Sequence, residues 1–247
     1  DLSYGENPHQ KAALYRENVI AMEHPAIVNA AQLSGKALSF NNILDLDTAL
    51  GIVSDFTSPT IAILKHNNPC GLACHNDLAE AYRRALTGDP VSAFGGVVSS
   101  NRTIDIATAR EIDKTHFDAM LAPDYTDEAF ALLRRKRDFR ILSTGPLSTG
   151  KESIPLSFRH VGGGFLLQTS DVEPADMSLR VMSDRKPTDE ETTALLFAWR
   201  VVKHVKSNAI VLARDYTLLG MGAGQPSRVD SVAIALKKAA ERASGSV

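Results

Sequence analysis

The chain has 247 residues, 44% of them hydrophobic and 23% charged, which is ordinary for a globular protein with a sizeable core. Its 27 basic and 29 acidic residues give a formal net charge of -2, which argues against general binding to nucleic acid or to an anionic membrane. The apolar runs fall far short of the ~20 residues that a membrane helix needs, and no charged-then-apolar leader is visible, so we expect a cytoplasmic location.

The first half of the chain predicts strands that alternate with capped amphipathic helices. In chain order we expect a polar loop over 1–10, an irregular segment to Lys36, a helix over 45–56, a strand over 60–64, a helix over 77–86, a loop entering a strand over 91–98, a helix over 106–114, a strand over 117–121, a helix over 126–137 and a strand over 139–142. The basic cluster at 134–137 is more typical of a helix C-terminus than of a nucleic-acid site, since cations there complement the helix dipole.

The second half begins with a stretch rich in Ser, Thr, Gly and Pro over 143–160, which indicates a loop or a seam between subdomains. A glycine-rich strand follows over 162–168, and then a polar linker over 170–187. Thr188 and Glu191 form a capping box for a helix that runs to about Lys206. The chain closes with a strand over 209–213, a hairpin turn at 215–217, a second strand over 218–220 and a helix capped by Ser227. This alternation predicts an α/β fold with layers of helices.

A Lys-His pair stands directly after the predicted strand over 60–64, at the head of Lys65-His66-Asn67-Asn68-Pro69-Cys70-Gly71. Strand ends of α/β proteins commonly carry reactive groups. His66 can accept a proton near neutral pH, and Lys65 can stabilise developing negative charge. An exposed strand end with two polar side chains explains the same residues equally well, and the residue types alone do not decide between the two.

Two further features concern ligands. Glycines over 220–225 lead into the last helix with Arg228 in its first turn, which fits either an anion site or a simple tight turn. Cys70 and Cys74 resemble the Pro-Cys-x-x-Cys zinc signature of deaminases, but the spacing is one residue too long and no His-x-Glu precedes it. We therefore expect no zinc, and we expect packed, reduced thiols rather than a disulfide.

Five segments in the same order resemble the transformylase half of the bifunctional purine biosynthesis family PurH, and the resemblance runs nearly end to end. They are Tyr4-Gly5-Glu6-Asn7-Pro8-His9-Gln10, Lys65-His66-Asn67-Asn68-Pro69-Cys70-Gly71, Ser92-Ala93-Phe94-Gly95-Gly96, Val205-Lys206-Ser207-Asn208-Ala209-Ile210 and Gly222-Ala223-Gly224-Gln225.

The resemblance implies transfer of a formyl group from 10-formyltetrahydrofolate to the 5-amino group of AICAR ribonucleotide, giving FAICAR. It implies two cytidine-deaminase-like α/β units, the first over 1–175 and part of the second over 176–247, and a homodimer with shared sites. Folate is a consumed substrate, so no cofactor is implied. The chain begins at Asp1 and stops just beyond a predicted helix, so we expect a piece of a longer protein, with IMP cyclohydrolase in an absent N-terminal domain.

Position by position, the resemblance makes His66 the proton acceptor and Lys65 the stabiliser of the transition state. It places AICAR or folate contacts at Tyr4, Asn42, Gly95, Asp118, Asn208, Arg228 and Val229, with Asn42 the weakest carry-over and Val229 on the folate side.

The chain departs from the family pattern at Ser3, where an Arg that helps to hold the substrate phosphate is usual. It departs again at Pro226, where a longer side chain is usual, and in lacking an aromatic-rich C-terminal segment. Two rivals stay open: a metal-free, deaminase-like hydrolase of a nucleotide, and a non-catalytic nucleotide-binding module.

Overall fold

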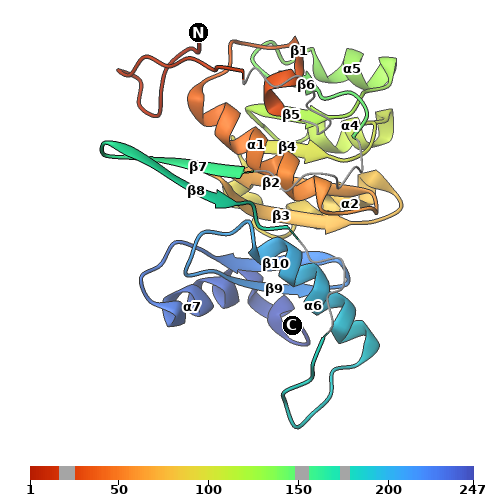
Figure 1. The fold of residues 1–247 in the computed structure, drawn as a ribbon. Helices are drawn as coiled ribbons and strands as arrows, with labels where there is room; N and C mark the ends of the chain where they lie inside the picture. Colours follow the sequence, from red (N-terminus) through yellow and green to blue (C-terminus); the bar gives the residue numbers. More distant parts are fainter. Residues whose placement is uncertain (17–25, 148–155, 173–178) are drawn as a thin grey trace.

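Eight strands form one mixed sheet in the computed structural model, which describes residues 1–16, 26–147, 156–172 and 179–247 (Figure 1). The strands β4, β5 and β6 are parallel to one another, and every other neighbouring pair in this sheet is antiparallel. A separate two-stranded hairpin, β7 (Leu156–Val161) and β8 (Gly164–Thr169), extends away from the sheet. Across the sheet the order is β1 (Ala31–Ser34), β6 (Arg140–Ser143), β5 (Ala119–Ala122), β4 (Val97–Ser100), β2 (Thr60–Lys65), β3 (Asn68–Cys74), β10 (Thr217–Gly222) and β9 (Ile210–Arg214).

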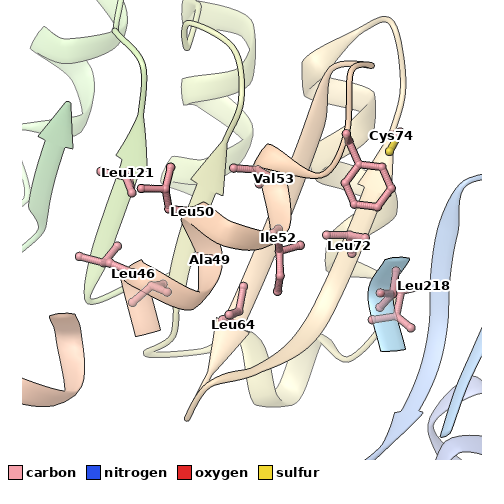
Figure 2. Close-up of a cluster of buried hydrophobic side chains, with 14 of the residues drawn as sticks. Leu46, Ala49, Leu50, Ile52, Val53, Leu64, Leu72, Cys74, Leu121 and Leu218 are labelled. Atoms are coloured by element: carbon pink, nitrogen blue, oxygen red, sulfur yellow. The ribbon is translucent and has the colours of Figure 1, made fainter. Parts of the chain in front are cut away.

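Helices cover both faces of the sheet. On one face lie α1 (Phe40–Ser54) and α6 (Asp189–Val202), and the labelled side chains of α1 in Figure 2 pack over Leu64, Leu72 and Leu121 of the strands beneath. The other face carries α2 (Leu78–Leu86), α4 (Ile106–Asp113), α5 (Asp127–Leu133) and α7 (Arg228–Ala239). The short elements are η1 (Ile27–Asn29), α3 (Pro90–Ala93) and η2 (Ala240–Ala243). The predicted α/β fold with a large sheet and layered helices is thus confirmed at this level.

Several predicted boundaries are wrong, and the reasons are local. The first helix begins at Phe40, not Asp45, because Ser39 and Asn42 form a capping box: the Asn42 N–H donates to Ser39 Oγ (3.2 Å), and Asn42 Oδ1 accepts the Ser39 N–H (3.0 Å). The sixth helix begins as predicted behind Thr188 but ends at Val202. Strands β1, β3 and β7 lie in stretches predicted to be irregular, turn and loop. Parts of three predicted irregular segments, 17–25, 148–155 and 173–178, lie outside the described residues.

An ion cluster joins the ends of α1 and α6. The Asp55 carboxylate lies 2.6 Å from His204 Nε2 and 2.9 Å from Lys203 Nζ, and the three side chains are only 17–23% exposed. Burial alone would raise the pKa of Asp55, but the hydrogen bonds from His204 and Lys203 outweigh it and lower that pKa below its usual value. The carboxylate therefore fastens two helices that are far apart in the sequence.

Both cysteines are buried free thiols, as predicted. Burial raises the pKa of Cys70 to about 12 and that of Cys74 to about 11, so both stay protonated at neutral pH. The Cys70 thiol donates to the Ile63 carbonyl (3.4 Å), and Cys74 Sγ lies 3.2 Å from Thr60 Oγ1.

Strands β9 and β10 come from the part of the chain expected to open a second unit, yet they extend the same sheet through β3. The division near residue 175 stays a prediction. Within the described ranges, no helix has the length and apolar character needed to cross a membrane.

Candidate active site

The carboxyl end of the central strand β2 lies at the same end of the sheet as the starts of β4, β5 and β6. We call this end of the sheet, with its loops, the sheet edge. Strand pairing aligns Leu64 with Val97, Val97 with Ala119, and Ala119 with Arg140. Because β2 is antiparallel to β4, whereas β4, β5 and β6 are parallel, the carboxyl end of β2 meets the amino ends of the other three. The loops at this edge carry most of the predicted site residues.

Three of these residues are brought together by hydrogen bonds to the backbone on either side of Gly95. Lys65 Nζ donates to the Phe94 carbonyl, next to Gly95, whose φ of 69° suits a glycine. A Cβ on Gly95 would lie 3.5 Å from Lys65 Nζ, so the backbone comes close to the ammonium group. The Asp118 N–H donates to the Gly96 carbonyl (2.8 Å). The structure therefore brings Lys65, Gly95 and Asp118 together.

His66 occupies a two-residue turn between β2 and β3. Lys65 pairs with Asn68, and the two residues between them are left-handed, with φ of 54° at His66 and 60° at Asn67, as in a type I′ hairpin. The His66 residue is exposed. The Asn67 N–H donates to Asp45 Oδ1 of α1 (2.6 Å).

Asn68 connects this turn to the loop that carries Asn208. Asn68 Nδ2 donates to the His66 carbonyl (3.0 Å), and Asn68 Oδ1 accepts the Lys206 N–H at 3.4 Å. Beyond Lys206, the Asn208 side chain donates to the carbonyls of Gln225 (3.0 Å) and Pro226 (2.8 Å). Hydrogen bonds thus run from the Lys65-His66 end of β2 to the glycine-rich loop before α7.

Arg228 lies at the start of α7, where an anion is favoured by the helix dipole. Its Nη2 donates to Asn208 Oδ1 (3.2 Å), which joins two predicted site residues directly. Val229 follows and is 74% exposed. Ser227 is the N-cap residue by position, but its side chain makes no capping hydrogen bond.

The N-terminal loop reaches the same edge from the other side. Arg140 donates to the Asp118 carbonyl (3.3 Å) and to the Ala37 carbonyl (3.0 Å). The next carbonyl, that of Leu38, accepts both the N–H and the hydroxyl of Ser3 (2.9 and 3.1 Å). The Tyr4 carbonyl accepts the Phe40 N–H at 3.1 Å. Ser3 and Tyr4 are therefore tied to the edge through backbone bonds.

Asn42 is buried, and its side-chain oxygen is used inside the capping box of α1. This arrangement gives Asn42 a structural task that its sequence context did not predict. The sequence did not predict that Asp45 and Asn68 take part in the candidate site through their hydrogen bonds to the turn. Asp45 marked only a helix start there, and the turn geometry that involves both residues becomes visible only in three dimensions.

Burial raises the pKa of Asp45 above its usual value, while hydrogen bonds from the N–H groups of Asn67 and His66 and the electrostatic interaction with His66 oppose that rise. Asp118 lies close enough to raise the same pKa slightly further. Among the cationic side chains, Lys65 bonds the Phe94 carbonyl, Arg140 bonds the Asp118 carbonyl and Arg228 bonds Asn208 Oδ1. The strand ends and loops here therefore bring carboxylate, imidazole, ammonium and guanidinium groups to one end of the sheet.

Two hollows lie at the opposite end of the sheet. One, of about 170 Å³, is lined by aromatic residues that include Phe56, Phe197 and Tyr216. The other, of about 600 Å³, is lined by Cys74 at the far end of β3 and by His75, among others. Neither of these two hollows is lined by a predicted site residue.

A family model described as the AICARFT/IMPCHase bienzyme matches residues 1–238. The whole chain also aligns with curated relatives named bifunctional purine biosynthesis protein PurH. The chain belongs to this family. The relative from Myxococcus xanthus (strain DK1622) is 48% identical over 250 residues, which cover 100% of this chain and 48% of the relative. The relative from Caldicellulosiruptor saccharolyticus is 44% identical over 246 residues, which cover 100% of this chain and 48% of the relative. The relative from Nostoc punctiforme is 47% identical over 248 residues, which cover 100% of this chain and 47% of the relative. The chain thus spans about half the length of these PurH relatives.

Proposed function

We propose that this chain is the transformylase part of a PurH-family enzyme. The reaction moves a formyl group from 10-formyltetrahydrofolate to the 5-amino group of AICAR ribonucleotide and yields FAICAR. The observation that carries the proposal is the row of residues along one end of the sheet in a chain of this family. The members of this row are Lys65, His66, Gly95, Asp118, Asn208 and Arg228.

The chemical difficulty is a weak nucleophile, because the lone pair of the AICAR amine is delocalised into the ring. His66 is the proposed base, and a positioned base contributes roughly 10²–10⁴-fold. Its exposed place on a turn leaves the imidazole accessible to a substrate. Lys65 is the proposed stabiliser of the oxyanion in the tetrahedral intermediate. An ammonium group has three donors, and the Phe94 carbonyl takes one of them, which fixes the group and leaves two for the reaction.

The nucleotide is held, in this proposal, by Arg228 and Asn208 on one side and by Tyr4, Gly95 and Asp118 on the other. Arg228 suits the phosphate, since guanidinium groups bind phosphate in a bidentate way and the start of α7 adds its dipole. Exposed Val229 is the proposed folate contact. Asn42 stays the weakest member of the set, because its side chain already caps α1.

The same proposal includes the assembly. We expect two cytidine-deaminase-like units divided near residue 175, a homodimer with shared sites, a cytoplasmic location and no metal or redox cofactor. IMP cyclohydrolase activity belongs, in this proposal, to a domain that precedes the present chain in the complete protein.

The test uses the complete natural protein with AICAR and 10-formyltetrahydrofolate, and follows the folate absorbance together with the appearance of FAICAR. Formyl transfer that depends on both substrates is the expected result. Ammonia release from AICAR without folate would favour the hydrolase instead. Calorimetric binding of AICAR without any turnover would favour a nucleotide-binding module, and either outcome would overturn the proposal.

A further inference from the structure

The turn that carries His66 adopts a left-handed backbone conformation without containing a glycine. Left-handed backbone is uncommon outside glycine, and here two successive side-chain-bearing residues adopt it. In a two-residue hairpin the ladder pairs only the flanking residues, here Lys65 and Asn68. The N–H groups of the two turn residues point away from the ladder and need partners elsewhere.

Asp45 supplies such a partner from a different element. Its carboxylate accepts the Asn67 N–H at 2.6 Å, across 22 positions of sequence. Asp45 is only 8% exposed and lies in the second turn of α1. It is therefore beyond the first turn, whose free N–H groups require a capping side chain. Burying a carboxylate costs free energy unless it is hydrogen-bonded. The hydrogen bond from the Asn67 N–H therefore compensates for the burial of Asp45.

We propose that Asp45 is a positioning residue, which holds the His66-Asn67 turn in its left-handed form and thereby aims the His66 imidazole along the sheet edge. The inference rests on the proposed formyl transfer. Asp45 touches neither substrate, and it acts through His66. Asn68 fixes the other side of the same turn by donating to the His66 carbonyl at 3.0 Å. The turn is therefore held from the helix by one side chain and from β3 by another.

The experiment compares two substitutions of equal shape in the complete protein. Asp45→Leu fills the space but removes the acceptor, whereas Asp45→Asn keeps an oxygen that can accept the Asn67 N–H. We expect Asp45→Leu to lower kcat by roughly 10²-fold, the scale of a misplaced catalytic group, with little change in KM for AICAR. Asp45→Asn should restore most of the rate. Asp47→Leu, at an exposed position of the same helix, is the matched control and should behave as wild type.

Two further measurements separate positioning from simple stabilisation. In a His66→Ala background, Asp45→Leu should cost no additional rate, because a residue that acts through His66 has nothing left to position. Hydrogen–deuterium exchange should show faster exchange at the Asn67 amide in Asp45→Leu but not in Asp45→Asn. Should Asp45→Leu fail to fold, Asp45→Ala takes its place.

The outcomes distinguish this inference from the function on which it rests. A wild-type protein that transfers no formyl group would refute the function, and exchange at Asn67 would still test the turn. An active wild type with normal kcat in Asp45→Leu would refute the positioning role. Unfolding of both Asp45→Leu and Asp45→Ala, or an equal loss of AICAR binding and turnover, would assign Asp45 to folding and overturn the proposal.

Discussion

Replacement of His66 should separate chemistry from folding. We expect His66→Asn and His66→Ala to lower kcat by roughly 10²-fold or more while AICAR affinity changes little, because a base acts in the transition state and contributes little to ground-state binding. Asn is the sharper substitution, since it tolerates left-handed backbone and keeps the turn.

The structure indicates how much replacing His66 should change the free energy of unfolding. His66 is exposed, and the hydrogen bond described for it uses its backbone carbonyl, so the ring adds little to the core. What remains is the φ of 54°, which Ala adopts less readily. We therefore expect His66→Ala to cost at most about 1 kcal/mol, or about 2–4 °C in Tm for a domain of this size, and His66→Asn to cost less.

The assay measures kcat and KM for formyl transfer, AICAR Kd by calorimetry, and Tm. His75→Asn is the matched control, because His75 lies at the far end of β3 and lines the larger hollow. His75→Asn should keep its rate. An early melting transition in His66→Asn with joint loss of binding and turnover would make the histidine a structural residue, and normal kcat would remove it from the reaction. Either result refutes the reasoning.

Three other changes test the fold and the edge. Asp55→Asn removes the carboxylate that joins α1 to α6 and should cost roughly 1.5–3 kcal/mol at pH 7 by denaturant unfolding. Because the folded-state pKa of Asp55 is lowered, its contribution is fully present above the unfolded pKa of about 4, so the difference from wild type should start to shrink near that pH and vanish only below the lowered folded-state pKa. Gly71→Ala should cost roughly 1–3 kcal/mol, since the new Cβ would lie 2.1 Å from the Ala85 carbonyl oxygen; a neutral result would mean that α2 can move. Ser3→Arg should tighten AICAR binding by roughly 1.5–3 kcal/mol if this loop faces the phosphate, and unchanged calorimetry would remove Ser3 from the site.

Capped helices were the most predictable part of the fold. The sequence predicted helix starts at Asn76 or Asp77, at Thr126 and at Thr188, and the side chains of Asp77, Thr126 and Thr188 accept backbone N–H groups in the first turns of α2, α5 and α6. The predicted cap at Ser227 is wrong, because its side chain makes no capping hydrogen bond. The capping box of α1 was missed because Asn42 replaces the usual Glu or Gln. Local hydrogen bonding explains both outcomes.

The missed strands owe their form to neighbours. Strand β3 contains Pro69 and Gly71, which locally indicate a turn, yet pairing with β2 on one side and β10 on the other makes it a central strand. Strand β1 is mostly exposed, so it lacks the alternation that reveals a half-buried strand. In both cases tertiary pairing overrides local preference, and no local pattern records that pairing.

The candidate site divides in the same way. The sequence marks Lys65 and His66 as chemical groups, and the resemblance adds Asp118, Asn208 and Arg228. The sequence does not indicate how residues so far apart in the chain come together, because their proximity follows from the order of the strands in the sheet. Asp45 escaped notice as a partner of the turn, since a bond across 22 positions between a helix and a hairpin has no periodic signature.

The place of the reactive pair at the end of β2 follows from the position of that strand. β2 lies between β4 and β3, so its end is the point from which Lys65 can reach Phe94 on one side while His66 is linked to Lys206 through Asn68 on the other. Its first five residues are buried, and a one-residue slip would turn every side chain to the opposite face. Both faces of β2 are packed, since Ala62 and Leu64 join one apolar cluster and Ile61 and Ile63 join the other. The buried strand therefore anchors Lys65 at its end and the adjoining His66-Asn67 turn, although the turn itself contributes almost nothing to the core.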